Sequence, residues 1–199
     1  MSLKKNTALA LTAIASTAIF SIALTAQADV LPQVKFATSA GDFVVELYPD
    51  KAPKTVENFL QYVRDKHYDG TIFHRVIPNF MVQGGGFDVK YAQKATRAPV
   101  VHEGRQALEK GGPRNVPGTL AMARTNDPQS ATAQFFINVN DNSFLNPSAR
   151  DYGYTVFGQV VSGMATIDKI KSTPTGSAGP FPSDVPKTPI LINSATLVN

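Results

Sequence analysis

The sequence predicts a mainly β protein, a closed antiparallel β-barrel with two α-helices. Short apolar runs of strand length recur along the chain, and 14 Gly and 14 Pro punctuate them. Only two segments have the periodicity of a helix. A sheet of many antiparallel strands exposes its edges unless it closes on itself, so we expect a barrel. The 199 residues are few for two full-sized domains, and no repeat or composition break divides them.

Residues 1–28 are expected to be a secretory signal peptide rather than part of the barrel. Lys4 and Lys5 give a positive start, residues 8–24 are uncharged and mostly apolar, and Ala26-Gln27-Ala28 has the small-x-small pattern of a cleavage site. An uncleaved anchor is the alternative, but the apolar stretch is shorter than the ~20 residues that a spanning helix needs. We therefore expect export to the periplasm, cleavage after the leader, and one domain over residues 29–199.

The mature domain is expected to begin with a hairpin and a helix. Two alternating runs between Val34 and Tyr48 flank a turn at residues 39–42, which predicts two paired strands. Pro53 suits the first turn of the helix that follows. The apolar stripe of this helix has the spacing i, i+3, i+4, i+7 and consists of Val56, Phe59, Leu60 and Val63.

The rest of the chain alternates strands with loops. Weak periodicity, glycine and charge predict long surface loops from Phe87 to Val116, and a Pro/Gly/Ser-rich composition predicts another loop from Pro174 to Pro189. Met164 to Ile170 is predicted to be the short second helix, with two isoleucines facing inward. The predicted strands lie around Ile72 and Val76, at Met81 to Gln83, and over residues 118–123, 133–139, 154–161 and 190–198.

Composition and motifs exclude most enzyme classes. The chain has no Cys, and its three histidines lack metal-ligand spacing, so we expect no thiol chemistry, no metal and no cofactor. No phosphate loop, dinucleotide fingerprint or nucleophile elbow is present. Removing the leader takes away two lysines and no acid, which lowers the formal charge from +4 to +2. We expect a monomer with no nucleic-acid partner, because the basic residues between 94 and 114 lack interleaved aromatics, and no membrane association after cleavage.

A mixed polar and apolar patch is predicted on the face of two neighbouring strands. Arg75 lies in an apolar run, where burying an unpaired guanidinium would be costly, so an outward-facing Arg is the simplest interpretation. Met81 and Gln83 share one face of the next strand, which sets an apolar and a polar group side by side. His74 has the opposite parity to Arg75 and is interpreted as structural.

A third strand adds an aromatic side chain to this patch. Alternation places Phe135 and Ile137 on one face and Gln134 and Phe136 on the other. If the first pair faces the core, Phe136 points outward beside an amide. Exposed aromatics beside Arg and Gln are typical of a shallow apolar site with polar edges.

Five segments, taken in order and spacing, resemble the signature strands of cyclophilins. They are Phe73 to Gly85, Gly118 to Ala123, Ala133 to Ile137, Phe144-Leu145 and Thr155 to Gly158. The resemblance covers essentially the whole chain after the leader and is strongest to the bacterial periplasmic branch. It implies an eight-stranded antiparallel barrel capped by two helices, with the site on its outer surface. The implied activity is peptidyl-prolyl cis–trans isomerisation of unfolded or flexible proline-containing polypeptides, without a cofactor.

The resemblance also implies residue roles. Arg75 matches the catalytic arginine, Gln83 the glutamine near the rotating amide, and Gln134 a neighbouring polar contact. Ala123 and Arg124 match positions that meet the peptide backbone ahead of the proline. The residues that match the proline pocket are Phe80, Met81, Phe136 and Leu145.

Two positions at the pocket rim differ from many members of the family. Phe144 stands where many carry Trp, and Tyr154 stands where many carry His. Both keep an aromatic ring, so isomerisation is expected to survive. The missing indole N–H removes a hydrogen-bond donor, so only weak binding of cyclosporin is expected.

Two other functions are compatible with parts of this pattern. A periplasmic peptide-binding chaperone would use the same groove without needing catalysis, but the Arg, the pocket and the Gln are present together. A barrel that carries a small apolar ligand needs an empty interior. Phe36, Phe135, Ile137 and Phe157 are large and predicted to face inward, which predicts a filled interior instead.

Overall fold

The computed structural model describes residues 30–198, and in this range the chain is mainly β. The expected signal peptide lies outside the described residues. Within them, no helix is long and apolar enough to span a membrane.

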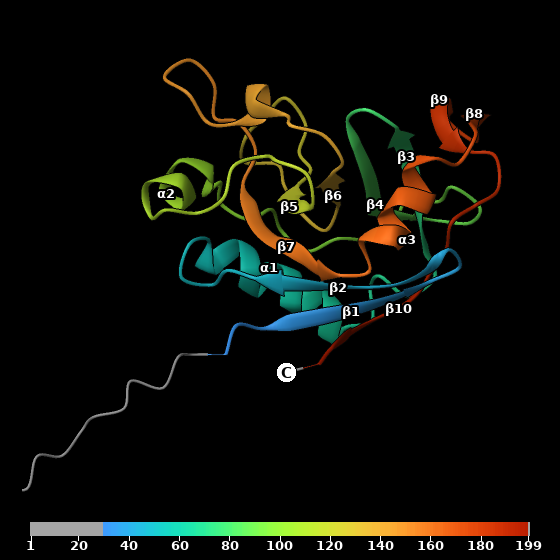
Figure 1. Cartoon of the computed structure of the whole chain (residues 1–199), viewed down its shortest axis with the longest axis horizontal. Coiled ribbons are helices and arrows are strands. Elements are labelled where there is room, and N and C mark those ends of the chain that lie inside the picture. The colour runs from blue at the N-terminus through green and yellow to red at the C-terminus, as the bar shows by residue number, and fades with distance from the viewer. Residues whose placement is uncertain (1–29, 199) are drawn as a thin grey trace, which may run out of the picture.

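The main sheet has eight antiparallel strands and forms a nearly closed barrel, as predicted (Figure 1). Its strands are β1 (Gln33–Thr38), β2 (Gly41–Leu47), β3 (Thr71–Ile77), β4 (Met81–Asp88), β5 (Thr119–Met122), β6 (Phe135–Asn138), β7 (Val156–Ser162) and β10 (Ile192–Leu197). Their spatial order is β10-β1-β2-β7-β5-β6-β4-β3. The sheet closes where β3 meets the start of β10: a bridge joins Ile72 and Leu191, and the Phe73 amide donates to the Ile190 carbonyl at 3.0 Å.

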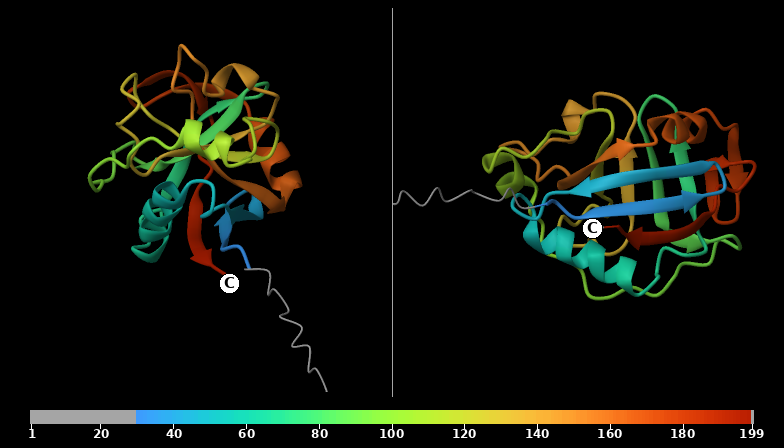
Figure 2. Two further views of the ribbon diagram at one scale, coloured as in Figure 1. Left: turned by 90° about the vertical axis from the view of Figure 1, so that its left-hand side faces the viewer. Right: turned by 60° about the horizontal axis from the view of Figure 1, so that its bottom comes forward.

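Helix α1 (Pro53–Arg64) forms where its apolar stripe predicts it, and Figure 2 shows it beside β10. The residue before it, Ala52, has no side chain that could cap the helix. The buried carboxylate of Glu103 takes that role, since it accepts hydrogen bonds from the amides of Lys54 at 3.1 Å and Thr55 at 2.8 Å. A carboxylate at a helix N-terminus satisfies free amides and complements the helix dipole.

The prediction of two helices was wrong by one, because the described chain has three α-helices. Helix α3 (Met164–Lys171) matches the predicted second helix and buries Ile167 and Ile170. Helix α2 (Gly104–Glu109) lies inside the segment predicted as loops. It has six residues and no apolar stripe, since Gly104 and Ala107 are its buried residues, so periodicity could not reveal it.

The loop predicted from Pro174 to Pro189 is also corrected, because it contains a hairpin of β8 (Thr175–Ala178) and β9 (Phe181–Pro186). Its Gly and Pro content is typical of a loop, and only Val185 and Pro186 of the two strands are buried, so no strand pattern was visible in the sequence. The hairpin packs outside the barrel against β3, where Phe181 lies edge-on to Phe87 at a centroid distance of 5.0 Å. Tertiary contact rather than local pattern therefore makes it a hairpin.

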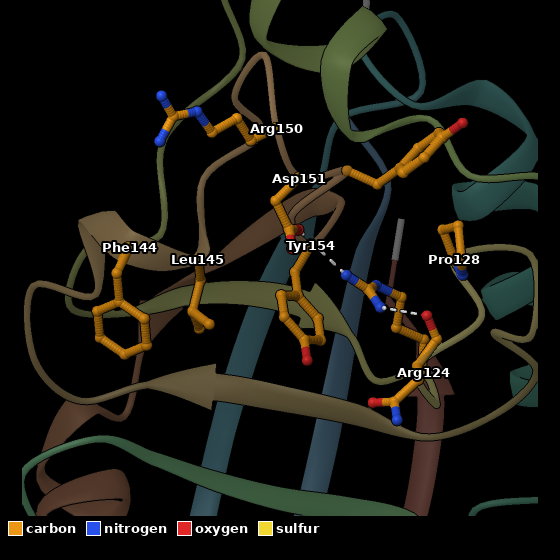
Figure 3. A pocket seen from close by; sticks show the side chains of 9 residues that line it. Arg124, Pro128, Phe144, Leu145, Arg150, Asp151 and Tyr154 are labelled. Carbon is orange, nitrogen blue, oxygen red and sulfur yellow. Dashed lines mark hydrogen bonds and ion pairs between the residues drawn. The ribbon is translucent and has the colours of Figure 1, made fainter.

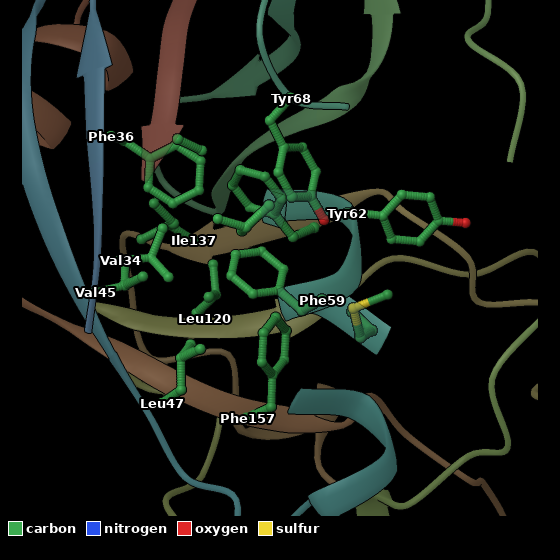
Figure 4. Packing of buried hydrophobic residues seen from close by; sticks show 14 of the residues in the cluster. Val34, Phe36, Val45, Leu47, Phe59, Tyr62, Tyr68, Leu120, Ile137 and Phe157 are labelled. Carbon is green, nitrogen blue, oxygen red and sulfur yellow. The ribbon is translucent and has the colours of Figure 1, made fainter. Parts of the chain in front are cut away.

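The barrel interior is filled with aromatic side chains, which excludes the carrier hypothesis. Figure 4 shows Phe36, Phe59, Tyr68 and Phe157 pointing toward one another between the strands. The rings of Phe36 and Phe43 stack with their centroids 4.9 Å apart, and the rings of Phe59 and Phe135 lie edge to face with their centroids 5.9 Å apart. The four side chains predicted to face inward, Phe36, Phe135, Ile137 and Phe157, are all fully buried in this interior cluster.

Candidate active site

One row of side chains crosses four neighbouring strands on the outer face of the barrel. Arg75 of β3 pairs with Gln83 of β4, and Gln83 pairs with Phe136 of β6. Phe136 pairs in turn with Ala121 of β5. Directly opposite side chains on one sheet face have Cβ atoms about 4.5–5.5 Å apart. The register therefore aligns the expected catalytic arginine with an amide and an aromatic ring.

A β-bulge in β3 sets the direction of Arg75. Phe73 and Val76 both belong to the interior cluster, although residues three apart in a regular strand lie on opposite faces. The β3–β4 register shifts between Phe73 and Arg75, which accommodates the extra residue. His74 packs outside the interior cluster, against Phe87 and Phe181. The opposite parity predicted for His74 was therefore wrong, because the bulge turns two consecutive side chains outward.

A second apolar cluster lies on this outer face. It comprises Met81, Ala121, Phe136, Leu145 and Val156 and is called the outer cluster below. Above it is a shallow depression, the central hollow. Its lining consists of Arg75, Phe80, Met81, Gln83, Ala123, Arg124, Phe136, Leu145 and Tyr154, all of them residues singled out in the sequence.

The remaining two predicted residues adjoin the central hollow. Phe144 is 72% exposed and stacks on Phe80 with a centroid distance of 5.7 Å, which extends the apolar rim. Gln134 lies on the opposite side and accepts a hydrogen bond from Gln83 Nε2 at 3.0 Å. Its side chain lies over Gly86, where an added Cβ would come within 2.5 Å of it. The structure thus brings all the predicted site residues together.

Arg75 keeps its guanidinium available at the edge of the central hollow. Its side chain is 45% exposed, and its Nε lies 4.0 Å from Asp184 Oδ2 on β9. Asp184 was missed in the sequence because it lies in the supposed loop. It has a φ of +66°, which is uncommon outside glycine, and Ser183 donates to its carboxylate at 3.0 Å. No local signal could have placed this carboxylate beside Arg75.

A buried network of asparagines fixes the loop walls of the central hollow. Asn142 donates to the carbonyl of Phe80 at 2.8 Å and to Asn138 Oδ1 at 2.7 Å. Asn115 lies next in the network, receiving from Asn138 Nδ2 at 3.1 Å and donating to the Leu145 carbonyl at 3.3 Å. The network therefore ties two pocket walls, at Phe80 and Leu145, to strand β6. Its only signal in the sequence is the cluster of Asn around residues 138–146.

Burial shifts the pKa values of the three histidines of this domain. It lowers the pKa of His74 to about 4, and it also lowers the pKa values of His67 and His102. In the part of the chain that the structure describes, no group of His, Asp and Glu could hold a metal ion. Among the described residues, neither a histidine nor a carboxylate lines the central hollow, so the site offers guanidinium groups, the amides of Gln83 and the adjoining Gln134, and an apolar surface.

The comparison with protein families identifies this arrangement. Residues 33–197 match the model described as cyclophilin type peptidyl-prolyl cis-trans isomerase/CLD. The chain belongs to the cyclophilin family. It is an isomerase of the peptidyl-prolyl cis–trans class, as predicted.

Curated relatives agree with this assignment. This cyclophilin is 51% identical over 164 residues to the peptidyl-prolyl cis-trans isomerase of Acinetobacter baylyi, a match that covers 82% of this chain and 84% of the relative. It is 52% identical over 167 residues to peptidyl-prolyl cis-trans isomerase B of Escherichia coli, covering 82% and 98% respectively.

Solved structures agree on the fold. A cyclophilin-type isomerase of Cryptosporidium parvum superposes with a TM-score of 0.64 at 24% identity, over 85% of this chain and 98% of that one. A second structure of that protein, obtained in the presence of the dipeptide Ala-Pro, has a TM-score of 0.63 at the same identity. At this identity the likeness establishes the barrel architecture of the cyclophilin.

Proposed function

We propose that this cyclophilin isomerises Xaa-Pro bonds of polypeptides exported to the periplasm and thereby assists their folding. The observation that carries the proposal is the half-exposed guanidinium of Arg75 at the edge of the central hollow, in register with Gln83 and Phe136. Side chains of the outer cluster form the apolar base of the hollow, and its volume of about 80 Å³ suits a single small ring such as that of proline. The Ala-Pro dipeptide named for the Cryptosporidium structure supports the same class of ligand.

The chemistry requires rotation about an amide without breaking a bond. Resonance gives this rotation a barrier of about 18–20 kcal/mol. In the twisted transition state the proline nitrogen becomes pyramidal and gains a lone pair that can accept a hydrogen bond. A donor from Arg75 then stabilises the twisted amide more than the planar one, which lowers the barrier. Phe80, Met81, Phe136 and Leu145 hold the ring, and Gln83 holds the neighbouring peptide group while the preceding carbonyl turns.

The decisive experiment replaces Arg75 and measures both isomerisation and binding. We expect Arg75→Ala to lower kcat/KM on an Ala-Pro peptide by about 10²–10³-fold, as for loss of a single transition-state donor. Arg75→Lys keeps the charge but not the planar fork of donors, so an intermediate loss is expected. Arg64→Ala, a change to an exposed Arg on α1, is the control. Unchanged turnover by Arg75→Ala would remove this arginine from the mechanism.

The same variants separate the isomerase from a chaperone that only binds peptides. If Arg75→Ala still suppresses aggregation of an unfolded client protein but the client refolds more slowly, folding of the client requires catalysis. If refolding is equally fast with Arg75→Ala and wild type, the groove acts by binding alone. Cyclosporin is expected to bind weakly, because Phe144 has no N–H to donate at the exposed rim. Nanomolar inhibition would contradict that expectation.

Export is supported by the N-terminal sequence, with its lysines at positions 4 and 5, its apolar stretch and its Ala-Gln-Ala site. If the leader is cleaved there, the protein recovered from the periplasmic fraction will begin at Asp29. Recovery of the uncleaved chain in the cytoplasm or membrane fraction would contradict the proposed location.

A further inference from the structure

A second depression, the side hollow, adjoins the central hollow. The two share Arg124, Leu145 and Tyr154 in their walls. The side hollow is the larger, at about 390 Å³ against about 80 Å³. Consecutive Cα atoms of an extended peptide are 3.8 Å apart, so a residue close to a bound proline can reach across a shared wall. The side hollow is therefore placed to contact the residues that flank the proline.

Two charged residues of the side hollow, Arg124 and Asp151, form an ion pair with each other (Figure 3). The Arg124 side chain is only 9% exposed; its Nε donates to the Gly153 carbonyl at 3.0 Å, and its guanidinium lies 4.5 Å from the Tyr154 ring centroid. Asp151 Oδ1 accepts from the Gly153 amide at 2.6 Å and from Arg124 Nη2 at 3.4 Å. These two residues form part of the wall, and their opposite charges offset each other.

Arg150 is the cation left available in this hollow. Within residues 30–198, its guanidinium makes no hydrogen bond and no ion pair. Figure 3 shows it extending away from the Arg124–Asp151 pair, on the side where Phe144 and Leu145 lie. Two exposed aromatic side chains also line the hollow, Phe144 at 72% and Tyr152 at 57% exposure. A guanidinium and an aromatic surface that line the same hollow match a carboxylate on a short aliphatic stem.

We propose that the side hollow is a specificity subsite for an acidic substrate residue, Asp or Glu, within two positions of the isomerised proline. This inference rests on the proposed isomerase function and adds the substrate class. Arg150 provides the charge, and Phe144, on the same side of the hollow, packs against the methylene groups of the acidic side chain (Figure 3). Lysine at the same substrate position is disfavoured by the same guanidinium.

The test uses peptides that carry Glu, Gln or Lys at each of the two positions before and the two positions after the proline. At low ionic strength we expect kcat/KM for Glu to exceed that for Lys by about two- to fivefold at one or more of these positions, the range of a single exposed ion pair. The Glu-to-Lys ratio should fall to about one in Arg150→Gln and invert in Arg150→Glu. Arg64→Gln, the same charge change outside the hollows, should keep the wild-type ratio.

Peptide dissociation constants from NMR titration of the same series separate the two proposals. If the wild type isomerises the Gln peptides but shows no preference for Glu, or if the preference persists in Arg150→Gln, the subsite is overturned and the isomerase stands. If no peptide is isomerised, the proposed function fails. The titration then still decides the subsite, by whether tighter binding of Glu depends on Arg150.

Discussion

The barrel carries two apolar clusters on opposite faces of the same strands. Neighbouring residues divide between them: Phe135 belongs to the interior cluster and Phe136 to the outer one, and the same holds for Leu120 and Ala121. The interior is closed by ring-on-ring packing. The outer cluster includes a small alanine, Ala121, and a hollow lies open beside its Met81, Phe136 and Leu145 side chains. One alternating pattern therefore produces both a core and a binding surface, and the face of the strand on which a side chain lies decides to which it belongs.

The sharpest test of this contrast truncates the two neighbouring phenylalanines. Phe135→Ala leaves a cavity in the closed interior, so we expect the free energy of unfolding to fall by about 3–5 kcal/mol. Phe136→Ala opens onto the hollow, where water can enter, so its stability loss should be smaller while kcat/KM falls about tenfold or more. Urea unfolding and the peptide assay measure the two effects. If Phe135→Ala and Phe136→Ala lost the same stability and had the same kcat/KM per folded molecule, the interior and outer clusters would not differ in role.

A third buried region, under the β8–β9 hairpin, should make stability depend on pH. His74 is 3% exposed there, and burial lowers its pKa from the ordinary 6.5 to about 4. The unfolded chain therefore binds a proton between pH 6.5 and 4 that the folded chain does not, so this contribution is present above pH 6.5 and is lost as the pH falls. The loss attributable to His74 should approach about 3 kcal/mol.

Unfolding of His74→Phe, measured from pH 7 to pH 4, isolates this contribution from those of His67 and His102. The variant should lose less stability over this range than the wild type. Parallel pH profiles would show that His74 does not control the acid response. The replacement keeps an aromatic ring between Phe87 and Phe181, so the hairpin should stay packed.

The walls of the central hollow depend on the buried asparagine network around Asn142. Asn142→Ala removes the donor to buried Asn138 Oδ1 and one of the two donors to the Phe80 carbonyl, which keeps the Val139 amide at 3.1 Å. We expect a loss of about 1–3 kcal/mol in stability and a raised KM, because the Phe80 wall is no longer fixed. A matching change of an exposed asparagine, Asn193→Ala, should do neither. An unchanged KM in Asn142→Ala would mean that the wall is fixed by packing alone.

The smallest expected effect concerns the carboxylate beside Arg75. Asp184→Asn keeps the side-chain shape but removes the charge that faces Arg75 Nε at 4.0 Å. We expect a two- to fivefold fall in kcat with little change in KM, because an exposed pair of this kind contributes little energy but restricts the guanidinium. Added salt should lower the kcat of the wild type more than that of Asp184→Asn. Equal salt dependence would leave Asp184 with a structural role only.

Much of the candidate site could be predicted from the sequence, because strand alternation and short motifs carry it. The eleven predicted site residues all line the central hollow or adjoin it, and the eight-stranded barrel forms as expected. Alternation failed at His74, where the bulge inserts a residue, and composition failed at the β8–β9 hairpin. These errors share a cause: each depends on a partner strand rather than on the segment itself.

By itself, the sequence determined which side chains face inward, where α1 and α3 form, and the family of the chain, since these depend on local periodicity and ordered motifs. Tertiary structure alone decided which distant groups meet. Glu103 caps α1 from 48 positions along the chain, Asp184 reaches Arg75 from a separate hairpin, and Arg124 joins the loop of Asp151. Such pairings have no period in the sequence, because they form only when the closed sheet brings its loops together.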